Sequence, residues 1–157
     1  MGSNKDKSQS QRILCASSGG GHWVEMRRVL PAFEGHELAF LTVQQAYQAE
    51  VGEADFHVVL DGTRWQKGHL VIMAIQVFWV LLKTRPDVVI STGAAPGYFA
   101  LVFGKLLGAR TIWLDSLANH ERLSLAGAKV GRWTDLWLTQ WEHLAVTGGP
   151  RFEGRVL

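Results

Sequence analysis

One local pattern occurs twice in this chain: a short apolar run, then a glycine-containing loop, then a helical stretch. Residues 13–16 lead into residues 17–22 (SSGGGH) and a helical pattern over residues 23–33. Residues 88–91 lead into residues 92–97 (TGAAPG) and a second helical pattern over residues 97–107. Such units build parallel sheets, whose strands all end at the same edge. We therefore predict a three-layer, Rossmann-like α/β domain with a mainly parallel sheet and both glycine loops at the sheet's carboxyl edge.

The rest of the chain continues this alternation. Further strands are predicted at residues 38–42, 56–60, 111–114 and 136–139, and further helices at residues 44–51, 70–83 and near residues 121–129. A chain of 157 residues fits one domain by size. We expect residues 1–11 to be a flexible polar leader and residues 12–157 to form the domain.

Composition excludes several classes of function. The formal net charge is only +2, so no basic surface for nucleic acid is expected. The single cysteine, Cys15, lies in an apolar run, which predicts a buried, reduced thiol and suits a cytosolic compartment. The leader lacks the apolar segment of a signal peptide.

The glycine loops predict an anion site. Glycine allows close approach of the backbone, and a helix that begins there adds partial positive charge, so phosphate or diphosphate is the natural ligand. A tight turn without ligand is the alternative for either loop alone. The candidate diphosphate-binding residues are Ser17, Ser18, Gly19, Gly20, Gly21, Thr92 and Gly93.

Common nucleotide and metal sites fit poorly. Val24 replaces the third glycine of a dinucleotide fingerprint, and no acidic residue follows the strand at residues 38–42, so NAD is disfavoured. The chain has no Walker P-loop and no Asp-x-Asp pair, and we expect neither a metal nor a cofactor.

Three motifs together resemble a known family. They are residues 18–22 (SGGGH), residues 86–93 (PDVVISTG) and residues 140–141 (QW). In this order they are similar to the membrane-anchoring subunit of the eukaryotic dolichyl-diphosphate chitobiose synthase and to related bacterial polysaccharide glycosyltransferase subunits. A more distant likeness is to the N-terminal half of the peptidoglycan transferase that makes lipid II. The resemblance covers residues 12–157.

The resemblance implies a GT-B-type enzyme divided between two chains. This chain would correspond to the N-terminal half and bind a polyprenyl-diphosphate-linked acceptor, and a partner subunit would bind the UDP-sugar donor. Residues 152–157 resemble the family's C-terminal segment that docks on the partner, and we expect the chain to be complete.

Four residues are candidates for acid–base catalysis. His22 closes the first glycine loop and is either the general base or a residue that only contacts the loop or the phosphate. Glu25 is expected first to cap the new helix and second to act in catalysis. Asp115 and Glu121, in the stretch after the strand at residues 111–114, are alternative bases, and Arg122 there is a candidate clamp for the diphosphate.

Residues 70–82 are apolar at every position except Gln76, which is typical of a buried helix but too short for a bilayer span. Lys67, His69, Lys83 and Arg85 flank this segment, which also fits a helix lying on lipid headgroups. The resemblance places a membrane-contact helix here. We expect contact through Leu70, Ile72, Met73, Ile75, Phe78, Trp79 and Leu82.

These observations predict one subunit of a two-component inverting glycosyltransferase, inactive or weakly active alone. We expect it to act in bacterial capsule or exopolysaccharide synthesis, at the cytoplasmic face of the plasma membrane as a peripheral protein. One alternative is a non-catalytic protein that recruits the active partner to the membrane. Another is a stand-alone nucleotide-binding enzyme.

Overall fold

The structure, a computed structural model, describes residues 10–156. Its centre is a seven-stranded sheet in which every neighbouring pair is parallel. In chain order the strands are β1 (Arg12–Ser17), β2 (Glu37–Thr42), β3 (Asp55–Val58), β4 (Val88–Gly93), β5 (Arg110–Leu114), β6 (Leu136–Thr139) and β7 (Arg151–Phe152). The predicted Rossmann-like, three-layer α/β fold is confirmed.

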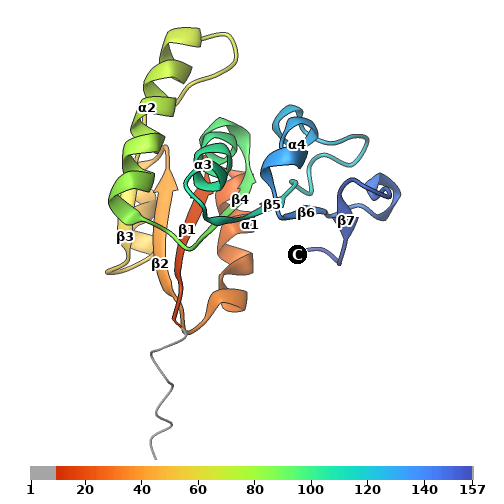
Figure 1. Ribbon diagram of the computed structural model, residues 1–157, viewed down its shortest axis with the longest axis horizontal. Coiled ribbons are helices and arrows are strands. Elements are labelled where there is room, and N and C mark those ends of the chain that lie inside the picture. The colour runs from red at the N-terminus through yellow and green to blue at the C-terminus, as the bar shows by residue number, and fades with distance from the viewer. Residues whose placement is uncertain (1–9, 157) are drawn as a thin grey trace, which may run out of the picture.

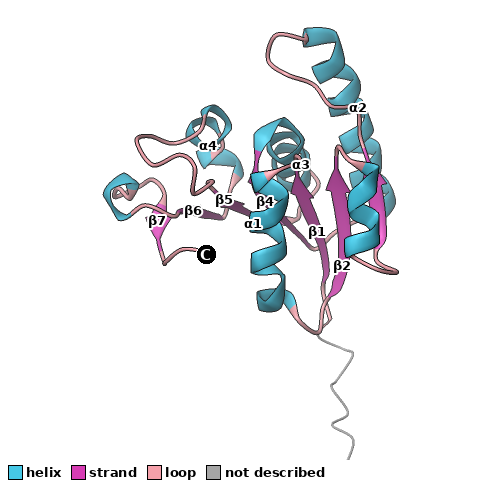
Figure 2. Cartoon of the chain, turned by 180° about the vertical axis from the view of Figure 1, so that it is seen from behind, coloured by secondary structure: helices cyan, strands magenta, loops and turns pink. Residues whose placement is uncertain are grey.

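Helices cover both faces of the sheet. The α-helices are α1 (Gly21–Val29), α2 (Lys67–Thr84), α3 (Ala94–Leu106) and α4 (Leu125–Lys129). Short 3₁₀ helices are η2 (Leu30–Phe33), η3 (Gln45–Glu50), η4 (Gly131–Trp133) and η5 (Glu142–Leu144). Helices α2 and α3 lie on one face (Figure 1), and α1 lies on the other, as the view from behind shows (Figure 2).

Alternation along β1 explains the two-sided core. Leu14 and Ala16 face α2 and α3, and Ile13 and Cys15 face α1. Because successive strand residues point to opposite faces, a strand buried on both sides must be apolar throughout. This is why the central strands read as continuous apolar runs.

The strand order places a topological switch point beside β1. The order is β3-β2-β1-β4-β5-β6-β7, so the chain builds outward from β1 to β3 and then crosses to β4 on the other side of β1. Ala16 pairs with Ser91 and Ser17 with Gly93. The loops that follow β1 and β4 therefore meet where open α/β sheets bind ligands.

The predicted elements differ from the structure in a few places. Pro31 has no N–H to donate, and the first helix gives way to η2 at Leu30. Residues 45–50 form a 3₁₀ helix instead of an α-helix, and β7, two residues long, was not predicted. Nine residues of the predicted leader lie outside the described residues. Gln11 does not belong to a free leader, because its N–H donates to Nδ1 of His36 (3.1 Å).

Candidate functional site

The first glycine loop ends at the start of a helix, where several N–H groups have no acceptor within the helix. Gly20 has φ 66°, a conformation that favours glycine, and α1 begins at Gly21. The first helical bond is donated by Val24 to the carbonyl oxygen of Gly20 (3.2 Å). The N–H groups of Gly21, His22 and Trp23 precede that bond and point out of the helix end. This geometry suits an anion, as the sequence predicts.

His22 joins the two glycine loops. Its Nδ1 lies 2.9 Å from the carbonyl oxygen of Thr92, and the Thr92 hydroxyl donates to the His22 carbonyl oxygen (2.6 Å). A carbonyl oxygen only accepts, so this contact requires a proton on Nδ1. In the neutral ring Nε2 then carries the basic lone pair. His22 is therefore oriented with one nitrogen fixed and the other available to take a proton.

The second loop has an unusual backbone. Gly93 has φ 140° and ψ 179°, a region open essentially to glycine alone. A Cβ on Gly93 would lie 2.4 Å from Cε1 and Nδ1 of His22. The next residue, Ala94, has φ 65° although it is not glycine, and α3 begins there. Strain of this kind costs about 1–3 kcal/mol and persists where the surroundings impose it.

Glu25 does not cap α1, contrary to the expectation. It lies one turn into the helix and is buried, and its Oε1 accepts from the Leu117 N–H (2.7 Å), the Ser116 hydroxyl (3.3 Å) and Nε2 of Gln140 (3.1 Å). Oε2 is buried without a hydrogen-bond partner within residues 10–156. The side chain thus points inward to the loop after β5 instead of back to the helix start.

Asp115 is also engaged structurally, which argues against its expected role as a base. Its Oδ1 accepts from Nε1 of Trp113 (3.1 Å) and the Ser124 hydroxyl (2.6 Å), and its Oδ2 accepts from the Ser124 N–H (3.0 Å). Glu121 and Arg122 are exposed on the loop that Asp115 closes. Both side chains are open to a ligand, although Oε1 of Glu121 lies 3.8 Å from Nε2 of His120, and the structure does not bring them into contact with the glycine loops.

Two further residues beside the first glycine loop, at the start of η3, were not predicted. Tyr47 accepts the Gly20 N–H through its hydroxyl (2.9 Å) and stacks on Trp23, with ring centroids 4.6 Å apart. The amide of Gln44 lies so close to Gly19 that a Cβ there would sit 2.8 Å from Nε2. Both follow β2, the neighbour of β1, so predicting them requires the strand order, which the sequence pattern does not give.

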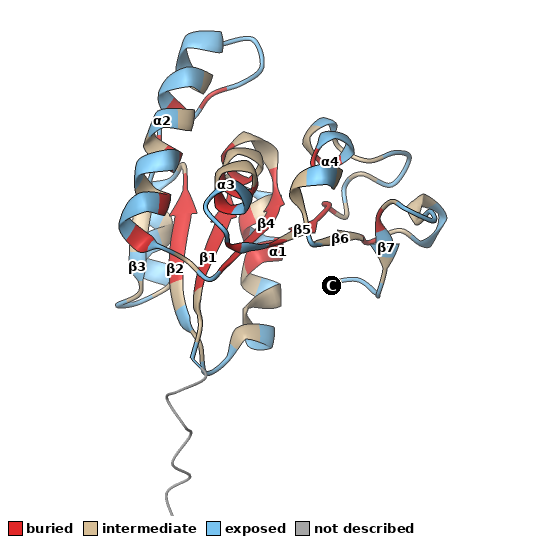
Figure 3. Ribbon diagram, in the orientation of Figure 1, coloured by how far each residue is buried: buried red, intermediate tan, exposed pale blue. Residues whose placement is uncertain are grey.

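Much of α2 is exposed (Figure 3), and its exposed residues include large apolar side chains. Trp79 is 64% and Ile75 54% exposed. Of the other expected contact residues, Ile72, Phe78 and Leu82 are exposed and Leu70 is half-buried. Met73 is fully buried under the helix, so this prediction was wrong.

Helix α2 has 18 residues and, within the described chain, is the one helix long and apolar enough to cross a membrane by length and composition alone. Four of its residues, Met73, Val77, Leu81 and Thr84, are buried. The three apolar ones belong to the core against the sheet, so the helix is part of the domain.

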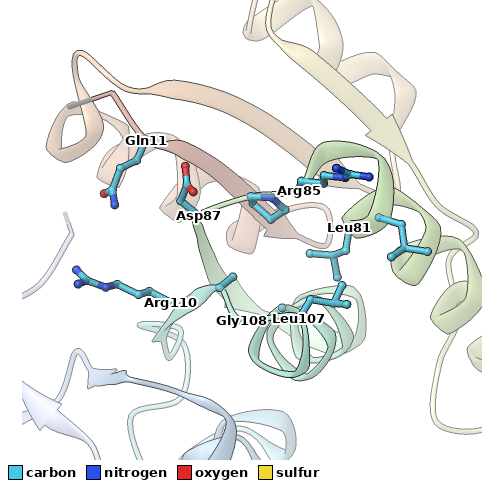
Figure 4. A pocket seen from close by; sticks show the side chains of 11 residues that line it. Gln11, Leu81, Arg85, Asp87, Leu107, Gly108 and Arg110 are labelled. Atoms are coloured by element: carbon cyan, nitrogen blue, oxygen red, sulfur yellow. The ribbon is translucent and has the colours of Figure 1, made fainter. Parts of the chain in front are cut away.

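A hollow of about 710 Å³ lies at the opposite edge of the sheet, where strands begin. Figure 4 shows its lining, with Gln11 and Asp87 ahead of β1 and β4 and Leu81 and Leu107 near the ends of α2 and α3. It includes no residue of either glycine loop. The glycine loops and this hollow therefore lie at opposite edges of the sheet.

Comparisons with known proteins agree with the predicted resemblance. The sequence is 28% identical over 148 residues to the UDP-N-acetylglucosamine transferase subunit ALG14 of Yarrowia lipolytica, which covers 90% of this chain and 65% of that protein. The chain therefore spans about two thirds of the length of this relative. No family model matches the chain.

Solved structures show the same fold. MurG of Acinetobacter baumannii superposes with a TM-score of 0.73 at 10% identity, over 89% of this chain and 44% of MurG. The UDP-GlcNAc 2-epimerase of Methanocaldococcus jannaschii gives 0.64 at 12% identity, over 82% of this chain and 39% of the epimerase. This chain is thus similar in sequence to a glycosyltransferase subunit, and in fold to less than half of each of these two larger proteins.

Proposed function

We propose that this chain is the acceptor-binding subunit of a two-component inverting glycosyltransferase. The observation that carries the proposal is the meeting of the two glycine loops at the switch point, with His22 bonded across them. Similarity to a UDP-N-acetylglucosamine transferase subunit supports the reaction class. A fold that matches under half of MurG supports a cleft completed by a second chain, which binds a UDP-sugar.

The site residues divide the chemistry between binding and proton transfer. The N–H groups of Gly21, His22 and Trp23 hold the diphosphate of a polyprenyl-linked acceptor, with Arg122 reaching it from the neighbouring loop. The acceptor hydroxyl oxygen attacks the anomeric carbon of the donor, and the bond from that carbon to the UDP oxygen breaks with inversion. The hydroxyl proton passes to Nε2 of His22.

The exposed face of α2 supports contact with the membrane. In Figure 1 the amino end of α2 extends past the carboxyl ends of the strands, on the side of the glycine loops. A lipid-linked acceptor in the bilayer could then reach these loops while Ile75 and Trp79 lie among lipid headgroups. We place the protein as a peripheral component at the cytoplasmic face of a bacterial plasma membrane, in capsule or exopolysaccharide synthesis. Ile75→Glu should weaken co-sedimentation with phospholipid vesicles, and unchanged co-sedimentation would refute this contact.

A second candidate function is a non-catalytic subunit that recruits the active partner. It is favoured by the structural engagement of Glu25 and Asp115, which leaves His22 and the exposed Glu121 as the acid–base candidates.

The His22→Ala variant, assayed in the reconstituted pair, separates the two functions. General-base catalysis predicts a fall in turnover of about 10²-fold or more, with the complex intact on size-exclusion chromatography. His36→Ala is the matched control, because the His36 ring also bonds a backbone group but lies at the opposite edge of the sheet. Unchanged turnover in His22→Ala would favour recruitment. Efficient transfer by the isolated chain would overturn the division between two subunits.

A further inference from the structure

Gln140 connects three parts of the chain through one buried side chain. It is fully buried, and its Nε2 donates to Oε1 of Glu25 (3.1 Å) and to the carbonyl oxygen of Asp115 (3.1 Å). Its Oε1 accepts from the N–H of Val156 (2.9 Å). Helix α1, the loop after β5 and the C-terminal segment therefore meet at a single carboxamide.

The loop after β5 is held through both backbone polar groups of one residue, Leu117. The Leu117 N–H donates to Oε1 of Glu25 (2.7 Å), and the Leu117 carbonyl oxygen accepts from Nε1 of Trp141 (2.8 Å). We call residues 116–122 the acceptor loop, because it ends in Glu121 and Arg122. Its path depends on Glu25 and on the pair formed by residues 140 and 141.

The C-terminal segment, residues 153–156, is attached by few contacts. Arg155 donates through Nε to the Gln140 carbonyl oxygen (3.0 Å) and lies 4.4 Å from the centroid of the Trp141 ring. Arg28 on α1 donates to the Val156 carbonyl oxygen (3.2 Å). Residues 153–155 are otherwise exposed. A segment held this way can detach without unfolding the sheet.

We infer that Gln140 is a positioning residue of the candidate site, and that residues 153–156 act through it as a latch on the acceptor loop. With the latch attached, the carboxamide is held with its oxygen toward Val156 and its nitrogen toward Glu25. With the latch detached, the oxygen loses its partner and the carboxamide can rotate, which releases Glu25 and the backbone N–H of Leu117. A molecule that captures residues 153–156 would thereby loosen the acceptor loop. The role of that loop rests on the proposed function.

Gln140→Glu tests the positioning role by amide hydrogen exchange. The new carboxylate would face Oε1 of Glu25 and the Asp115 carbonyl oxygen, with no N–H left to donate. A hydrogen bond to a charged group contributes enough that its loss should speed exchange of the Leu117 amide at least about tenfold. In the double variant Glu25→Gln/Gln140→Glu an amide again faces a carboxylate, and exchange at Leu117 should return to within about threefold of the wild type. Rescue of this kind is not expected from a general loss of packing.

Deletion of residues 153–157 tests the latch without changing a buried side chain. We expect faster exchange at Leu117 and unchanged exchange at Cys15, which lies in the centre of β1. The latch is refuted if Leu117 exchange is unchanged in the deletion variant. The positioning role is refuted if it is also unchanged in a folded Gln140→Glu.

Kinetics of the reconstituted pair then test the acceptor loop separately. Gln140→Glu should raise KM for the lipid-linked acceptor by about tenfold and leave KM for the UDP-sugar unchanged. Equal effects on both substrates would overturn the assignment of this loop to the acceptor. A wild-type pair without transferase activity would refute the proposed function, and the exchange measurements would still decide the latch.

Discussion

Replacing Gly93 by alanine tests whether the two glycine loops depend on each other. The added Cβ would lie 2.4 Å from two atoms of the His22 ring, well inside van der Waals contact. The ring must then leave the position from which Nδ1 meets the Thr92 carbonyl oxygen. The backbone at position 93 adds a second penalty, because its φ of 140° suits glycine alone.

The expected loss of stability follows from these two effects. Backbone strain of this kind costs about 1–3 kcal/mol, and loss of one hydrogen bond costs about 1 kcal/mol. The free energy of unfolding should therefore fall by about 2–4 kcal/mol. At a urea dependence of about 2 kcal/mol per molar, the midpoint of unfolding falls by about 1–2 M. Tryptophan fluorescence can follow the transition, since Trp23 packs beside the first loop.

Two controls separate the steric clash with His22 from the backbone strain at position 93. Gly148 has φ 78° and open space around it, so Gly148→Ala reports strain without a collision. The second control is the double variant His22→Ala/Gly93→Ala, which removes the ring that the new Cβ meets. His22→Ala should destabilise the wild type by about 1 kcal/mol and the Gly93→Ala protein by close to nothing. The contact between the loops would be refuted if the stability losses of His22→Ala and Gly93→Ala were additive. It would also be refuted if Gly93→Ala lowered the free energy of unfolding no more than Gly148→Ala does.

Three further predictions concern other parts of the chain. Gln44→Glu places a negative charge beside the first glycine loop and should weaken binding of inorganic pyrophosphate about fivefold by calorimetry, whereas Gln48→Glu, with the same charge change one turn away, should have a smaller effect. Burial raises the pKa of Cys15 to about 12, so a thiol reagent should leave it unmodified until the chain is unfolded in urea, and rapid labelling of the folded protein would contradict this. The hydrogen bond from Lys105, aided by one from the backbone of Thr111, lowers the pKa of Asp135. A depressed folded pKa stabilises above the unfolded value, about 3.9, and the contribution disappears as the pH falls through the folded pKa. The urea midpoint of Asp135→Asn should thus lie below that of the wild type at pH 7 and converge with it in acid, and a constant gap would contradict the assignment.

The sequence contained enough information for the sheet and its two glycine loops, because these depend on local patterns. Strands β1 and β4 carry apolar runs that are buried on both faces, Ser18 and three glycines follow β1, and Gly93 ends β4. What it lacked was the order of the strands. Gln44 and Tyr47 join the site only because β2 is the neighbour of β1, and no local feature of residues 44–47 indicates that contact.

The surroundings of Glu25, Asp115 and Met73 differ from those expected, for related reasons. Capping is a plausible expectation for any carboxylate near a helix start, but Glu25 finds donors on a loop 92 residues away in sequence. Asp115 lies in a polar stretch of sequence, where a carboxylate is expected to face solvent. The stretch folds back, however, and the N–H and hydroxyl of Ser124 donate to the Asp115 carboxylate. Met73 belongs to a helix that is apolar on every face, so periodicity cannot show which side packs on the sheet.

The connectivity also links the proposed membrane face to the edge of the sheet that carries the candidate site. Helix α2 is the crossover that takes the chain from β3 to β4, and it packs along α3, where the partly exposed Phe78 ring lies 5.4 Å from the Phe103 ring between centroids. Helix α3 begins at Ala94, directly after the loop that His22 contacts. If the outer side of α2 lies on lipid, then the second glycine loop is two packed helices from the bilayer, with no flexible segment between. Contact with the membrane and alignment of the acceptor site would then be properties of one rigid unit, which is what an acceptor confined to the bilayer requires.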